Sequence, residues 1–106
     1  MSRRCRRFEV LLPHQFNDGR AVPKKWLIDA IFEIAEHFDG VAHETQDVSG
    51  IWRHKGATYR EKFTRVVVDI QDKPNNRQWM RDYKNRWKAR LEQIELWMVS
   101  YRIEIE

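Results

Sequence analysis

The segment 74–94 has the sequence PNNRQWMRDYKNRWKARLEQI and carries the clearest periodic pattern in the chain. Asn75 and, three residues later, Gln78 form a capping-box pattern that predicts the beginning of a helix. Beyond them, apolar side chains recur at steps of four or seven residues and fall on one helical arc of about 120°. Such a face is typical of a helix that packs on a core, so we interpret it as core rather than as a ligand pocket. Its members are Trp79, Met80, Tyr83, Trp87, Leu91 and Ile94.

Strand patterns flank this helix on both sides. Residues 96–105 alternate with a strict period of two, which predicts a final strand. Residues 59–70 are rich in β-branched side chains, and they predict a strand that pairs with residues 41–54 across a turn at residues 55–56. The region before the long helix is therefore predicted to be a β-hairpin.

The N-terminal part predicts one more strand and one more helix. Alternating apolar residues from Phe8 to Leu12 predict a strand that Pro13 closes. Pro23 suits the first position of a helix, and the pair at 39–40, Asp-Gly, predicts its end. The apolar positions of that helix are Leu27, Ile31, Ile34 and Phe38.

The resulting order is strand, helix, strand, strand, helix, strand. Two right-handed crossovers fold this order into an α+β structure of the ferredoxin-like βαββαβ type, with a four-stranded antiparallel sheet and both helices on one face. One such domain is predicted over residues 8–106, since a chain of 106 residues suits a single core. The helix-free face would carry Phe63, Arg65 and Val67, and such a face usually meets a partner, often a second copy of the chain.

Composition excludes wholesale disorder and collagen-like or membrane-spanning classes, because 42% of residues are hydrophobic and 34% are charged. The net charge of +4 equals the contribution of Arg3, Arg4, Arg6 and Arg7. Residues 1–7 are therefore predicted to be a basic, mobile N-terminal tail that could attract nucleic acid.

The single cysteine, Cys5, excludes a disulfide within the chain. The arginines beside it resemble a twin-arginine export signal, but the apolar stretch that such a signal needs is missing. A cytoplasmic location is therefore predicted.

Metal and catalytic signals are sparse. The four histidines are widely scattered, and the sequence contains neither a CxxC nor an HxxxH pattern. No metal site and no cofactor are therefore predicted. His54 with Glu61, across the hairpin turn, is the candidate pair for general acid or base catalysis if the protein is a nuclease. A charged pair on the surface of a hairpin is the alternative.

Nucleic-acid binding has one candidate surface besides the tail. On the second helix, Arg77, Arg81, Lys84 and Lys88 form a stripe that could follow phosphates, although acidic residues interrupt the helix surface. The third strand contains one aromatic residue and no glycine in 62–69, which disfavours the base-stacking pattern of RNA-recognition motifs.

The hairpin carries the pattern G-x-W-R, a turn glycine, and then R-E before an apolar strand, between Gly50 and Glu61. In this pattern the chain resembles a family of small uncharacterised bacterial ferredoxin-like proteins, related to a domain-of-unknown-function family. The similarity also covers residues 8–19 and 83–106. The resemblance implies a compact bacterial domain and singles out Trp52, Arg53, Arg60 and Glu61; cross-strand ion pairs are the structural alternative for the charged positions.

Two functions follow from these observations. The first is a non-enzymatic, homodimeric binding or regulatory module that uses the helix-free sheet face and the hairpin. The alternative is a small nucleic-acid-binding or toxin-like ribonuclease protein that uses the arginine tail and the helix stripe.

Overall fold

The computed structural model describes the backbone of residues 3–54 and 57–106, and the side chains of residues 4–42 and 62–106. The order of elements is the predicted one, and the α+β class with two helices and an antiparallel sheet is confirmed. The elements are β1 (Arg3–Pro13), α1 (Lys24–Phe38), β2 (Ala42–His54), β3 (Ala57–Gln71), α2 (Pro74–Arg90) and β4 (Met98–Ile105).

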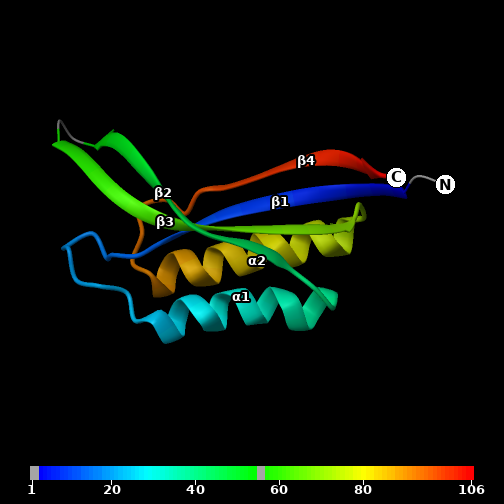
Figure 1. Ribbon diagram of the computed structural model, residues 1–106, viewed down its shortest axis with the longest axis horizontal. Coiled ribbons are helices and arrows are strands. Elements are labelled where there is room, and N and C mark those ends of the chain that lie inside the picture. The colour runs from blue at the N-terminus through cyan, green and yellow to red at the C-terminus, as the bar shows by residue number, and fades with distance from the viewer. Residues whose placement is uncertain (1–2, 55–56) are drawn as a thin grey trace.

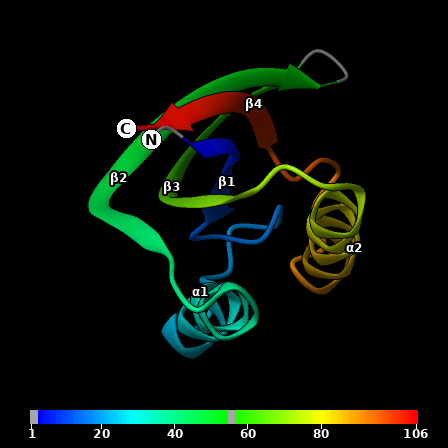
Figure 2. The ribbon, with the colours of Figure 1, turned by 90° about the vertical axis from the view of Figure 1, so that its right-hand side faces the viewer.

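The sheet has the strand order β2-β3-β1-β4, in which β1 lies between β3 and β4 and is antiparallel to both. Both helices lie on the same side of the sheet (Figure 1 and Figure 2). Because side chains alternate along a strand, β1 turns Phe8, Val10 and Leu12 toward the helices, where they are buried. The residues between these, such as Arg7 and Glu9, belong to the helix-free side, which we call the open face.

The core lies between the sheet and the two helices, and Tyr83 of α2 is at its centre. The Tyr83 side chain is fully buried, and its hydroxyl donates a hydrogen bond to the carbonyl oxygen of Ala30 in α1 at 2.8 Å. Burial raises the pKa of Tyr83 well above its ordinary value. Nearby, the indole nitrogen of Trp87 donates to Glu33 at 2.8 Å. These two bonds tie α2 to α1 and confirm the predicted core face for Tyr83 and Trp87.

The ends of α2 differ from the prediction. The helix ends at Arg90, and Glu92 adopts a left-handed φ of 53°, so the helical spacing does not reach Ile94, which is exposed. The assignment of Ile94 to the core face is therefore wrong. At the other end, Lys73 is the N-cap and Pro74 begins the helix, so Asn75 lies within the first turn and caps nothing.

The first strand begins earlier than predicted. Arg3 to Arg7 are part of β1 and pair with β4, and from Cys5 onward β1 pairs with β3 as well: Arg6, for example, lies opposite Ile70 of β3 and Arg102 of β4. The predicted boundary between a tail and the domain at residue 8 is corrected accordingly. Pairing with the neighbouring strands fixes the backbone of residues 3–7, which the distribution of charge predicts to be a mobile tail.

Candidate functional site

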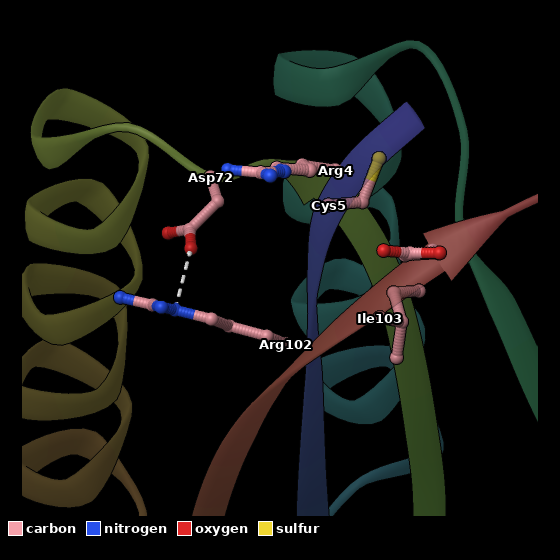
Figure 3. Close-up of a pocket in the computed structure, with 6 residues that line it drawn as sticks. Arg4, Cys5, Asp72, Arg102 and Ile103 are labelled. Carbon is pink, nitrogen blue, oxygen red and sulfur yellow. Dashed lines mark ion pairs between the residues drawn. The ribbon is translucent and has the colours of Figure 1, made fainter. Parts of the chain in front are cut away.

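A cavity of about 600 Å³ opens where the ends of β1 and β4 meet the beginning of α2. Figure 3 shows Arg4 and Arg102 extending toward Asp72, whereas Cys5 and Ile103 project away from that carboxylate. The charged groups, which we call the charged side of the pocket, therefore lie on the helix side of the sheet, whereas Cys5 and Ile103, which lie opposite each other in β1 and β4, belong to the open face. Its lining residues are Arg4, Cys5, Asp72, Arg102, Ile103 and Glu104.

Asp72 is the centre of the charged side. Its carboxylate accepts a hydrogen bond from Nε of Arg6 at 3.1 Å and another from Nη1 of Arg77, and Nε of Arg102 lies 3.6 Å away. The Asp72 side chain is 13% exposed. The hydrogen bonds from Arg6, and then from Arg77, hold the pKa of Asp72 below its ordinary value. Asp72 is consequently ionised at neutral pH.

Strand register explains why these side chains meet. Arg6 lies opposite Arg102 in the β1–β4 pair, so both point to the helix side of the sheet. Gln71, the last residue of β3, lies opposite Cys5, which brings Asp72 next to the N-terminal end of β1. The chain then enters α2, and Arg77 reaches back from its first turns to the same carboxylate.

Positive charge exceeds negative charge at this site. The described side chains of the charged side comprise four arginines and two acids. Arg102 is 83% exposed, and its contact with Asp72 is longer than a good hydrogen bond. Guanidinium groups bind carboxylate or phosphate through two parallel N–H groups, so the pocket offers the chemistry of an anion site. The arginines are Arg4, Arg6, Arg77 and Arg102, and the acids are Asp72 and Glu104.

The predicted tail arginines divide between the two faces of the sheet. Arg4 and Arg6 reach the pocket, whereas Arg7 lies on the open face and forms a two-bond ion pair with Asp69 at 2.7 and 2.9 Å. The hydrogen bond to Asp69 raises the pKa of Arg7. The sequence alone does not predict this pocket, because its charge distribution places these arginines in a mobile tail. Arg4 and Arg6 precede Phe8 at steps of two residues, so they continue the alternation of the first strand. This spacing was the signal that could have placed them in the strand.

The predicted stripe on α2 is partly neutralised. Arg77 pairs with Asp72, and Nζ of Lys84 lies 3.0 Å from a carboxylate oxygen of Glu95. The hydrogen bond from Lys84 lowers the pKa of Glu95. Arg81 donates to the side-chain oxygen of Gln78 at 2.9 Å.

The hairpin candidates can be placed only by their backbone. His54 lies opposite Ala57, and Glu61 lies opposite Gly50, so the predicted catalytic pair is four residues apart along the hairpin, roughly 13 Å. This register does not support a direct bond between them. The side chains of Trp52, Arg53, His54, Arg60 and Glu61 lie outside the described residues, as does that of Arg3, and their roles stay predictions.

The three predicted partner residues of the open face differ in accessibility. Phe63 is buried, whereas Arg65 and Val67 are partly exposed. Arg65 forms an ion pair with Glu9 across the face. A contact with a partner would therefore use Arg65 and Val67 rather than Phe63, and the dimer itself stays a prediction.

The described part of the chain contains neither a cluster of metal ligands nor a helix suited to crossing a membrane. No three His, Cys, Asp or Glu residues gather there as metal ligands. Neither of its helices combines the length and the apolar character that a membrane crossing requires.

Comparison with known proteins gives one structural likeness. No protein-family model and no curated protein matches the chain. The solved structure of a phage SAM lyase in complex with S-methyl-5′-thioadenosine is similar, with a TM-score of 0.69 and 6% sequence identity, over 95% of this chain and 88% of that chain. At this identity the likeness shows a shared fold alone. The resemblance to the bacterial domain-of-unknown-function family stays a prediction.

Proposed function

We propose that this protein is a binding module for a small ligand that bears a phosphate group, and that the pocket at Asp72 is its site. The main support is the pair of exposed arginines, Arg4 and Arg102, which lie on either side of Asp72. The carboxylate of Asp72 is already paired with Arg6 and Arg77. A ligand phosphate between Arg4 and Arg102 would gain charge-assisted hydrogen bonds.

We also propose that the fold is of the ferredoxin-like type. The strand order β2-β3-β1-β4, with two helices on one side, supports this assignment. The similar phage protein is a lyase whose complex contains a nucleoside derivative. That likeness does not favour a strictly non-enzymatic role, so the proposal concerns binding and does not depend on an absence of catalysis.

Titration calorimetry with pyrophosphate tests the pocket. The wild-type chain should bind pyrophosphate, and Arg102→Gln should weaken binding about tenfold, which is typical for one lost charge-assisted hydrogen bond. Lys25→Gln, an exposed cation on α1, is the matched control and should leave the affinity unchanged. If the wild-type chain gives no binding heat, or if both variants weaken binding equally, the pocket is not the site.

A second proposal concerns the open face, which we propose as a homodimer contact. Support comes from Tyr101 and Trp97, which remain exposed on or beside β4, and from the partly exposed Val67 on β3. Light scattering after gel filtration should show a dimer for the wild type and a monomer for Val67→Asp. Tyr101→Glu provides a second variant, because a new carboxylate at Val67 would lie opposite Glu9 and could disturb the fold. A monomeric wild type at high concentration would refute the dimer.

A further inference from the structure

The outer edge of the sheet at β4 is a regular strand edge. β4 is the last strand in the order β2-β3-β1-β4, so only one of its sides pairs with another strand (Figure 1). It pairs with β1 residue by residue from Met98 to Ile105. The strand at the opposite edge, β2, has a register shift between His43 and Asp47. Such irregularities protect an edge against pairing with another chain, and the continuous register of β4 gives no such protection.

The backbone hydrogen bonds show which residues of β4 face outward. The amide of Leu11 donates to the carbonyl oxygen of Trp97 at 3.0 Å, so these residues form a hydrogen-bonded pair of the antiparallel ladder. Such pairs recur at every second residue, so the odd-numbered residues of β4 direct their N–H and C=O groups toward β1. The even-numbered residues direct theirs to the free edge. Of these, Ser100, Arg102 and Glu104 have exposed side chains, which leaves the edge open to another strand.

The charges on this edge are self-complementary. In an antiparallel pair of β4 strands, a two-fold axis through Ile103 places Arg102 of each copy opposite Glu104 of the other. Both residues face outward, so each such pair exchanges two backbone hydrogen bonds as well as forming an ion pair. An axis through Arg102 or Glu104 instead places like charges opposite each other, which destabilises a strand pair. Because an axis through Tyr101 pairs neither charge with its opposite, the register centred on Ile103 is favoured.

Both charged side chains are available to a second copy. Arg102 is 83% exposed, and its Nε lies 3.6 Å from Asp72, which is longer than a good hydrogen bond. Glu104 is exposed and forms no salt bridge with any described side chain. Neither residue has to give up a short ion pair in order to form the contact.

The same register pairs apolar side chains on the open face. Ile103 lies opposite Ile103 of the second copy in a non-hydrogen-bonded pair, where side chains are closest, and Tyr101 lies opposite Ile105. Tyr101 is 42% exposed, and both isoleucines are partly exposed. Cross-strand pairs of aromatic and β-branched residues stabilise a sheet, so the contact covers apolar surface as well as charge.

We propose that the edge of β4 binds the edge of β4 in a second copy, in the antiparallel register centred on Ile103. This contact goes beyond the one proposed for the open face, because Val67 lies on β3, which β1 separates from this edge. A standard interface has about 20–30 residues on each side, whereas residues 100–106 supply seven. We therefore expect a weak contact, which doubles the assembly only at concentrations above those of gel filtration.

Sedimentation equilibrium at rising concentration tests the contact, in a buffer without phosphate because Arg102 also belongs to the pocket. The wild type should form a species of twice the mass found in gel filtration. Arg102→Glu should weaken this step about tenfold, because it places two carboxylates opposite each other at both symmetric positions. Glu104→Arg should do the same with two guanidinium groups. A mixture of the two variants should recover the step, since each carboxylate then lies opposite a guanidinium group.

Lys25→Glu and Glu36→Arg are the matched controls. They make the same changes of charge at exposed positions of α1 and should associate like the wild type. Circular dichroism should show all variants folded. Equal weakening by the controls would mean that net charge acts instead of the edge, and it would overturn the proposal. A wild type whose mass does not rise with concentration would also overturn it, and would leave the edge to a strand of another protein.

The outcomes distinguish the edge contact from the open-face contact. If Val67→Asp lowers the mass found in gel filtration while the two charge variants associate like the wild type, the face contact stands and the edge contact is refuted. If the charge variants lose the concentration-dependent step and their mixture recovers it, the edge contact stands. The face contact is refuted in that case if Val67→Asp leaves the mass in gel filtration unchanged.

Discussion

Asp72→Asn is expected to raise the affinity of the pocket for pyrophosphate about tenfold, which corresponds to the free energy of one additional charge-assisted hydrogen bond. In the wild type the carboxylate occupies guanidinium groups that a phosphate would otherwise bind, and it repels the incoming anion. Arg102 is the group most easily released, because it lies 3.6 Å from Asp72 and is 83% exposed. Titration calorimetry on both chains provides the comparison.

The same substitution should change how stability depends on pH. The pKa of Asp72 is lowered in the folded chain, first by Arg6 and then by Arg77. A lowered carboxyl pKa stabilises the fold above the unfolded value, and that contribution disappears as the pH falls through the folded value. Asp72→Asn should therefore be less stable than the wild type at pH 7, and the difference should shrink below about pH 4.

Urea unfolding at pH 7 and pH 3 measures this difference. Glu104→Gln is a suitable comparison, since it removes a pocket carboxylate that forms no salt bridge with any described side chain. If Asp72→Asn weakens pyrophosphate binding instead, Asp72 holds the arginines in position rather than competing with the ligand.

Tyr83→Ala is expected to lower the free energy of unfolding by about 3–5 kcal/mol, the cost of removing a large aromatic side chain from a core. Tyr83 is fully buried between the helices and the sheet, so the lost ring would leave a cavity rather than a surface. A domain of this size has about 5–15 kcal/mol of stability in total. The variant should thus lie close to the unfolding threshold, as urea titration followed by circular dichroism will show.

Tyr83→Phe separates the hydroxyl from the ring. It loses only the hydrogen bond to the carbonyl oxygen of Ala30, at a cost of about 1 kcal/mol. Equal losses for Tyr83→Phe and Tyr83→Ala would mean that the hydrogen bond, and not packing, dominates at this position. Neither variant should alter pyrophosphate affinity while folded, since Tyr83 does not line the pocket.

Local periodicity was enough to predict the six elements, because burial of one face imposes a period on each strand and helix before any tertiary contact is known. The core positions Tyr83 and Trp87 followed from that period alone. Ile94 did not, since the turn at Glu92 depends on how the chain leaves α2 to reach β4. The arginines at 3–7 were also misassigned, because polar strand residues carry no hydrophobic signal.

The pocket, by contrast, was decided by tertiary structure. Asp72 lies 66 residues from Arg6 and 30 from Arg102 along the chain, and no local pattern connects them. Only the antiparallel register of β1 with β3 and β4 brings these residues to one end of the sheet, next to α2. Chain composition determined that the protein carries an excess of four positive charges. Strand pairing determined which of these positive side chains meet at the cavity. Electrostatic interactions depend on distances in space, whereas the sequence gives only the order of residues along the chain.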